Sequence, residues 1–436
     1  MPPNKARYTK QYWGIRGNPF PRLGTLLKPE EQEFVFTGRD EDLDEFCSYT
    51  ERPGGLFLYG LHGAGKTLFL LRSLAILEEQ NAFCVYASFN PDDGFINSLL
   101  LAFLKRLGLE EPEWLELYNK LLGRNIKITR ERTKEAGGEV ALPFIKFSPK
   151  GTFKEVENIE QVIANPRRWL QDLIEELAQS NRQVILALDD LDNQEIVLKL
   201  EEEEVESSEL SLNDIDIIVR EARQLMTAGA TVMLVGHPSG PTAALGSSNI
   251  LNSFELASLD QADLVEMLKR YLALGRADGL REIKFDPFTE GAANLIANTI
   301  TRLKLPTRSM LFACSELFEY CAREGIVLID ESVVRNHWPN VVKLLRGSLK
   351  RQDANYLRVI EESGGYDEDK SQAINEIAGP VAEFLDGLKK LVPLVHKELL
   401  IENARGTFKL NPLLAAQNVF TDDNLPEPDD MDAGEL

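Results

Sequence analysis

The chain has 436 residues, a formal net charge of −22 and a hydrophobic content of 43%. This length predicts two to four domains at roughly 100–200 residues each, with enough apolar residues to bury several cores. No segment reaches the roughly 18 uninterrupted apolar residues that a membrane helix needs, so we expect no membrane contact. The first ten residues are polar and basic with no apolar stretch behind them, which argues against a secretory signal.

The four cysteines are scattered along the chain. Cys314 and Cys321 are seven residues apart in a helical pattern, which is the spacing of one buried helix face. A disulfide or a metal site is the alternative, but the scatter favours buried free thiols. We therefore expect a protein of the reducing cytoplasm.

The net negative charge argues against general nucleic-acid binding, because neutralisation of phosphates carries most of such affinity. The charge is uneven, however. Residues 1–29 carry six basic residues and no acid, and residues 120–154 carry nine basic residues against three acids. Residues 201–209 and the tail 421–436 are strongly acidic. A solvated face or loop explains any such run, but the two basic segments oppose the charge of the whole chain and are candidates for DNA contact.

The first half of the chain alternates short apolar runs with amphipathic stretches, which predicts an α/β fold with a parallel sheet and helices on both faces. Residues 120–154 interrupt this alternation and favour a basic hairpin insertion. The predicted strands are 56–59, 83–87, 184–188 and 231–235, and the predicted helices are 66–79, 94–107, 166–179 and 213–228.

The second half has a different pattern. Residues 260–345 contain four segments with helical spacing and predict an all-α unit, which we call the lid. Further helical segments at 350–362, 371–378 and 380–391 precede two short strands at 399–401 and 407–410, an order typical of a winged helix. The predicted division is a basic arm at 1–36, an α/β core at 37–256, the lid at 257–340, a winged helix at 341–415 and an acidic disordered tail at 416–436.

The segment from Gly60 to Thr67 matches G-x-x-x-x-G-K-[ST] in full, between a predicted strand and a predicted helix. Its glycines let backbone N–H groups surround phosphates, and the following helix directs its positive end toward them. Lys66 is expected to reach the β- and γ-phosphates of ATP, and Thr67 to bind Mg²⁺. The predicted nucleotide-binding residues here are Gly60, Leu61, His62, Gly63, Ala64, Gly65, Lys66, Thr67 and Leu68. His62 occupies a variable position and is interpreted as tolerated rather than catalytic.

The apolar run from Val184 ends in Asp189 and Asp190. This places carboxylates at the carboxyl end of a buried strand, where open α/β sheets bind their ligands. Asp189 is the expected partner of Mg²⁺, through water, and Asp190 is expected to orient the attacking water. The alternative is a buried strand that simply ends in an acidic turn.

Two further residues complete the predicted site. His237 follows the apolar run that ends at Val235 and could sense the γ-phosphate, the alternative being a capping or core histidine. Arg308 opens a helix of the lid, and a guanidinium brought over the phosphates from a second domain would couple nucleotide state to domain closure. An exposed arginine near a helix start is the alternative.

The order of these motifs resembles the AAA+ ATPases, and within them the branch of origin-recognition replication initiators and transposition-associated ATPases. The stretch from Thr37 to Leu43 is similar to one that precedes the phosphate loop in that branch and packs near the adenine, which implies that Arg39 binds nucleotide. Asn18-Pro19-Phe20 also recurs in such proteins. The resemblance covers roughly residues 15–345 and extends more weakly to 411, and it assigns His237 and Arg308 as sensors of the bound nucleotide.

Two departures from that family pattern stand out. Asp190 replaces the glutamate that active members usually carry, and residues 237–268, where the family keeps its arginine finger, contain no Arg or Lys. Such a finger contributes roughly 10³–10⁵ in rate to phosphoryl transfer. Arg220 and Arg223 are alternative candidates. The sequence therefore favours a slow, switch-like ATPase over a processive motor.

Two functions are compatible with these features. The first is an ATP-regulated ATPase of initiator or mobile-element type that binds duplex DNA through residues 1–29, residues 120–154 and the winged helix. The second is a signalling or scaffold ATPase of a bacterial defence or regulatory system, which binds a protein partner or self-associates. Residues 343–412 hold eleven basic and eleven acidic residues, and such a neutral winged helix suits either function.

Overall fold

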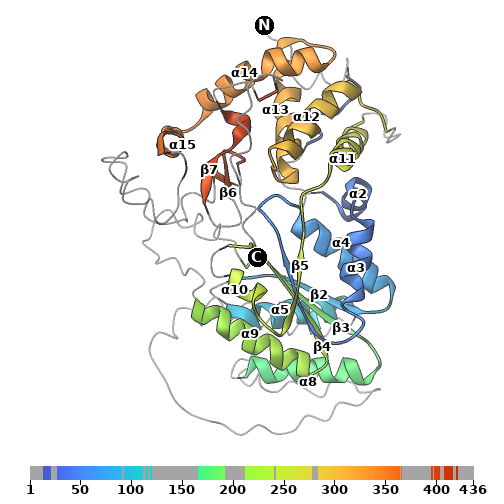
Figure 1. The fold of residues 1–436 in the computed structure, drawn as a ribbon. Coiled ribbons are helices and arrows are strands. Elements are labelled where there is room, and N and C mark those ends of the chain that lie inside the picture. Colours follow the sequence, from blue (N-terminus) through green and yellow to red (C-terminus); the bar gives the residue numbers. More distant parts are fainter. Residues whose placement is uncertain are drawn as a thin grey trace.

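We describe the protein from a computed structural model (Figure 1). The predicted basic insertion, the acidic run and residues 421–436 of the predicted tail lie outside the described residues, as do most of residues 1–26. Val419 and Phe420, near the start of the predicted tail, are described and buried. The described residues are 13–20, 27–90, 93–110, 114–115, 118–119, 165–191, 212–239, 242–276, 283–363, 365, 394–395, 397–402, 407–415 and 419–420.

The first half of the chain forms a five-stranded parallel sheet in the order β2-β3-β4-β1-β5. The two central strands β3 and β4 are buried along their whole length, because helices cover both faces and their residues are almost all apolar. The predicted α/β fold is confirmed. The strands are β1 (Gly55–Tyr59), β2 (Phe83–Ser88), β3 (Val184–Asp189), β4 (Ala230–Gly236) and β5 (Leu251–Glu255).

Successive residues of each strand point to opposite faces of the sheet. Phe57 packs with α5, α8 and α9 on one face, whereas Leu56 and Leu58 pack with α3 and α4 on the other. Figure 1 shows these two helical layers on either side of the sheet. The helices are α3 (Asp40–Ser48), α4 (Lys66–Glu79), α5 (Gly94–Glu110), α8 (Pro166–Gln179) and α9 (Leu212–Thr227), with the short α10 (Ala243–Gly246) before β5.

Strand β5 was absent from the prediction. It pairs with β1 alone among the described strands, so it is an edge strand with only Leu251 and Phe254 buried. Such a segment lacks the continuous apolar run of a central parallel strand. Its pairing nevertheless places the segment that leads into the lid directly beside β1.

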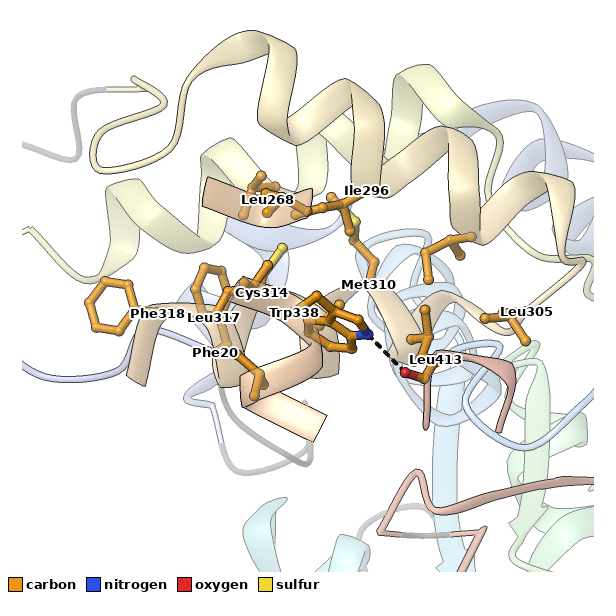
Figure 2. Close-up of a cluster of buried hydrophobic side chains, with 14 of the residues drawn as sticks. Phe20, Leu268, Ile296, Leu305, Met310, Cys314, Leu317, Phe318, Trp338 and Leu413 are labelled. Carbon is orange, nitrogen blue, oxygen red and sulfur yellow. Dashed lines mark hydrogen bonds between the residues drawn. The ribbon is translucent and has the colours of Figure 1, made fainter. Parts of the chain in front are cut away.

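The lid has a hydrophobic core of its own, separate from the two clusters that flank the sheet. Its helices confirm the predicted helical segments: α11 (Gln261–Leu274), α12 (Glu290–Arg302), α13 (Thr307–Glu324) and α14 (Glu331–Ser348). The early helix α2 (Pro29–Val35) packs on α11. Figure 2 shows Phe20, from the N-terminal segment, packed among Cys314, Leu317 and Phe318 of α13.

Residues 13–20 are joined to the lid although they are far from it in sequence. The indole N–H of Trp13 donates to the Val327 carbonyl at 2.7 Å. The side-chain amide of Asn18 donates to the Ser315 hydroxyl at 2.8 Å, and Phe20 is buried beside it. The Asn18-Pro19-Phe20 motif therefore anchors the start of the chain to helix α13.

The C-terminal unit, which comprises the described residues from 351 to 420, shares one hydrophobic core with the lid. The indole N–H of Trp338 in α14 donates to the Leu413 carbonyl at 2.8 Å, as Figure 2 shows, and its ring meets Phe420 edge-on at 5.2 Å. The two predicted short strands are present and pair in antiparallel orientation, while the predicted helices at 371–378 and 380–391 lie outside the described residues. The elements are α15 (Arg351–Ser363), β6 (Leu400–Glu402), β7 (Phe408–Leu410) and the short 3-10 helix η7 (Pro412–Leu414).

All four cysteines are free, as predicted, and three of them are buried. Burial raises the pKa of the Cys321 thiol to about 12 and holds it in the unreactive protonated form. Within the described ranges, none of the helices combines the length and the apolar character that crossing a membrane requires.

Replacing Trp338 with alanine should destabilise the protein by about 3–5 kcal/mol, because the change leaves a cavity in the core shared by the lid and the C-terminal unit. Chemical denaturation monitored by circular dichroism measures this loss. The matched control is Leu344→Ala on the same helix, where the side chain is 44% exposed and the cost should be small. Equal effects of the two changes would show that lid and C-terminal unit do not depend on this contact.

Candidate functional site

The candidate site lies at the carboxyl edge of the parallel sheet. Strands β1, β3 and β4 end next to one another, because β4 pairs with both β1 and β3 in parallel register. Gly60 follows β1, Asp189 ends β3, and His237 follows β4. Open α/β sheets bind ligands at this edge, so the fold brings three of the predicted site segments together.

The loop after β1 has the conformation expected of a phosphate-binding turn. Gly63 and Gly65 adopt left-handed backbone with φ of 83° and 99°, which side chains with a Cβ rarely accept. Helix α4 begins at Lys66, directly after Gly65. The Lys66 ammonium donates to the carbonyls of Gly60 at 2.8 Å and Leu61 at 3.3 Å, so the loop itself holds this cation at the helix N-terminus.

The other residues predicted in the loop differ in burial. Ala64 is buried and its N–H donates to the Leu61 carbonyl at 3.1 Å, which closes the turn. His62, Thr67 and Leu68 are half-buried. The Thr67 hydroxyl stands in the first turn of α4, where the positive end of the helix attracts anions.

Asp189 is buried at the end of β3, with 2% of its surface exposed. One of its oxygens accepts from the Asp190 N–H at 2.9 Å and the other from the Tyr86 hydroxyl of β2 at 3.2 Å. Burial, with the charges of the two aspartates, raises the pKa of Tyr86 far above its usual range. Tyr86 is therefore a permanent neutral donor that fixes the orientation of the Asp189 carboxylate.

Asp190 has left-handed backbone, with φ of 61°, which is uncommon for a residue other than glycine. Its carboxylate accepts from the Ser88 hydroxyl at the end of β2, at 2.7 Å. Ser88 is the register partner of Asp189, so the two neighbouring strands present this pair together. The hydroxyl thus holds the carboxylate that was predicted to orient water.

His237 is buried and stacks on His62, with ring centroids 4.7 Å apart and an interplanar angle of 18°. The Ser239 hydroxyl lies 2.7 Å from His237 Nδ1. The predicted alternatives for His237 are a sensor and a capping or core histidine. The structure shows a buried ring that also touches the loop of residues 60–67, the predicted phosphate loop, and the sequence did not predict this contact.

The lid contacts the loop through the first turn of α13. The Arg308 N–H, one of the donors that a helix leaves unpaired at its start, donates to the Gly63 carbonyl at 3.0 Å. A Cβ on Gly63 would come within 2.8 Å of the Arg308 Cβ. Glycine at position 63 is thus required both by its backbone angle and by the close approach of the lid.

The Arg308 guanidinium faces a carboxylate of the C-terminal unit. Its Nε lies 3.8 Å from Glu398 Oε1, an ion pair too long for a hydrogen bond. Its NH1 nitrogen is buried and has no hydrogen-bond acceptor among the described residues. A buried guanidinium N–H in that state can donate to a hydrogen-bond acceptor of a ligand at small cost.

Arg39 is buried and its donors are directed to the protein. NH1 pairs with Asp42 at 2.9 Å, and NH2 donates to the Ala257 carbonyl between β5 and the lid. This residue therefore ties the start of α3 to the segment connecting core and lid. The two finger candidates, Arg220 and Arg223, lie on α9, where both are exposed.

No group of three or more His, Cys, Asp or Glu side chains among the described residues is placed to hold a metal. Nucleotide sites need no such group, because Mg²⁺ there keeps several waters and is held by phosphates with one or two protein oxygens. Thr67 and Asp189 are compatible with that mode of binding.

The chain was compared with protein families, with curated proteins and with solved structures. No family model matches it, and no curated protein matches it. The chain resembles origin-recognition proteins. A protein of this kind from Aeropyrum pernix, solved in complex with DNA, is 15% identical over 92% of this chain and 97% of its own, with a TM-score of 0.40.

Two other solved structures are similar to the same extent. Cdc6p from Pyrobaculum aerophilum is 15% identical over 90% of this chain and 97% of its own, with a TM-score of 0.35. A chain of the Drosophila origin-recognition complex bound to DNA is 13% identical over 89% of this chain and 90% of its own, with a TM-score of 0.38.

Replacing Gly63 with alanine should destabilise the protein by about 1–3 kcal/mol, because the new Cβ strains the backbone and pushes Arg308 away. The control is Gly347→Ala near the end of α14, where nothing lies within 4 Å of the added Cβ and alanine favours the helix. Denaturant unfolding of both variants measures the difference. Equal stabilities would contradict the close contact between loop and lid.

Proposed function

We propose that this chain is an ATP-binding switch of slow turnover that binds duplex DNA under the control of the nucleotide. The observation that carries the proposal is the convergence on one loop of a cation, a helix N-terminus and the lid. Lys66, the start of α4 and the N–H of Arg308 all meet the segment from Gly60 to Thr67. Phosphate binding at such a loop would report directly to the lid.

In this proposal the phosphates lie against the loop N–H groups and the Lys66 ammonium. Mg²⁺ would be held by the Thr67 hydroxyl and, through water, by Asp189, and would neutralise charge on the β- and γ-phosphates. Arg308 NH1 would donate to the terminal phosphate, because it is buried and lacks an acceptor in the described chain. His237, with His62 stacked on it, would sense that phosphate from the end of β4.

Slow turnover follows from the group that would orient water. Asp190 has a shorter side chain than glutamate, and the Ser88 hydroxyl at 2.7 Å holds its carboxylate. The stretch 237–268 has no Arg or Lys that could stabilise charge in the transition state. An arginine from elsewhere would be needed for a rate gain of roughly 10³–10⁵.

Contact with duplex DNA is supported by the basic segments 1–29 and 120–154, which oppose the charge of the chain. Residues 13–20 of the first segment are hydrogen-bonded to the lid. A movement of the loop could therefore reach that segment through α13. DNA is also bound to two of the similar solved structures.

A second function is favoured by the net charge of −22 and the balanced charge of residues 343–412. These features suit a switch that binds a protein partner, or a second copy of itself, when ATP is bound. DNA binding and its salt dependence separate the two functions.

Replacing Lys66 with alanine should weaken ATP binding by about 10²-fold or more, because a charge-assisted contact to the phosphates is lost. Calorimetric titration with ATP and Mg²⁺ measures the affinity. Lys343→Ala, which removes an exposed lysine of α14, should bind ATP as the unmodified chain does. Unchanged affinity in the Lys66 variant would refute the assignment of the loop.

Binding to a 30-base-pair duplex in the presence of ATP and Mg²⁺ should fall by about 10³-fold between 50 and 200 mM salt, if at least six phosphates are contacted. Replacing Arg130, Arg132 and Lys134 together with glutamine should reduce this slope. The charge-matched control is Arg52→Gln, Lys105→Gln and Arg323→Gln together, three exposed residues outside the segments proposed to bind DNA. Absence of any complex at 50 mM salt would leave only the protein-partner function.

A further inference from the structure

Glu398 is a buried acid from the C-terminal unit that reaches the candidate nucleotide site. Only 6% of its surface is exposed, and it stands just before β6, some 330 residues from the phosphate loop along the chain. Buried carboxylates are rare unless they are paired or hydrogen-bonded. Its surroundings therefore indicate what it does.

The position of Glu398 is fixed by the backbone around it. Its φ is 57°, in the left-handed region that a residue with a Cβ seldom adopts. Its carbonyl accepts from the side-chain amide of the fully buried Asn411 at 2.9 Å, and its N–H donates to the Val395 carbonyl at 2.9 Å. The C-terminal unit thus holds this side chain against α13.

Three groups face the Glu398 carboxylate. Ser309 of α13 donates to Oε2 at 3.0 Å, and Arg308 of the same helix turn lies 3.8 Å from Oε1. His62, from the phosphate loop, also acts on it electrostatically. Burial raises the pKa of Glu398 to about 7, although Arg308, Ser309 and His62 each oppose that rise. The carboxyl group thus changes charge close to neutral pH.

Arg308 is only partly satisfied by this carboxylate. The pair is too long for a hydrogen bond, and NH1 has no acceptor among the described residues. A phosphate oxygen is a stronger partner for a guanidinium than a carboxylate at 3.8 Å, because it can accept a short charge-assisted hydrogen bond. Two anions, one internal and one from a ligand, would therefore compete for the same cation.

We propose that Glu398 competes with the terminal phosphate of the nucleotide for Arg308, and so sets how strongly the site prefers a nucleoside triphosphate to a diphosphate. The inference rests on the proposed function, which supplies the nucleotide. Only the triphosphate carries the terminal phosphate with which Glu398 competes for Arg308. Glu398 is a positioning residue, because it acts on the ligand through Arg308.

The test is the ratio of the dissociation constants of ADP and ATP in Glu398→Gln, measured by calorimetry with Mg²⁺. Glutamine keeps the shape and an acceptor for Ser309 but removes the charge. The preference for ATP should rise by about tenfold, as expected for the loss of one charge a few ångströms from the guanidinium. Glu362→Gln, an exposed acid of α15 in the same unit, is the charge-matched control and should leave the ratio unchanged.

Removal of Arg308 tests the route of the effect. In an Arg308→Ala background, Glu398→Gln should change the ratio little, since the cation for which both anions compete is gone. An equal effect with and without Arg308, or no change of the ratio in Glu398→Gln alone, would overturn the inference. Glu398→Met, uncharged and of similar length, serves for the same measurements if the glutamine variant does not fold.

The pH dependence gives an independent readout. Below pH 7 the Glu398 carboxyl is neutral and should compete weakly, whereas above pH 7 it is charged and should compete fully. The preference for ATP over ADP should therefore fall from pH 6 to pH 8. This fall should be larger in the unmodified chain than in Glu398→Gln. Titration of the ATP phosphate itself is common to both and cancels; parallel profiles would overturn the inference. If the unmodified chain binds neither nucleotide, the proposed function itself fails.

Discussion

The hydrogen bond from the Arg308 N–H to the Gly63 carbonyl is the constraint on which the rest of the site depends. It forms because the first N–H groups of a helix have no partner within the helix. In addition, Gly63 has no Cβ at the point where the lid approaches the loop. The same contact brings the Arg308 side chain to the loop. A loop that only bound phosphate would not need a hydrogen bond to the lid. The geometry would therefore couple phosphate binding at the loop to the position of the lid.

In the proposed switch the lid would transmit a change at this contact, because its core is continuous with that of the C-terminal unit. Trp338 bridges the two by packing on Phe420 and donating to Leu413. If a bound phosphate moved α13, the C-terminal unit would have to move with it, or the packed interface between them would break. Packed cores shift between discrete arrangements rather than deforming smoothly. Glu398 then lies where the C-terminal unit can oppose or permit the movement.

The central strands and the phosphate loop were predictable because their signals are local: continuous apolar runs before Gly60 and Asp189, and a complete glycine-lysine motif. Strand β5 was not, because an edge strand with two buried residues lacks such a run. The approach of Glu398 to Arg308 has no local signal at all. It arises from chain folding over some 90 residues, and a glutamate near two short strands is indistinguishable in sequence from an exposed one.

The most direct measurement is amide hydrogen exchange of peptides from 60–67, 305–312 and 397–402, compared between bound ATP and bound ADP with Mg²⁺. Both nucleotides should protect the loop, whereas only ATP should alter exchange at the start of α13 and around Glu398, because only ATP carries the phosphate that reaches Arg308. Identical exchange patterns with ATP and ADP at the second and third segments would contradict a nucleotide-controlled lid.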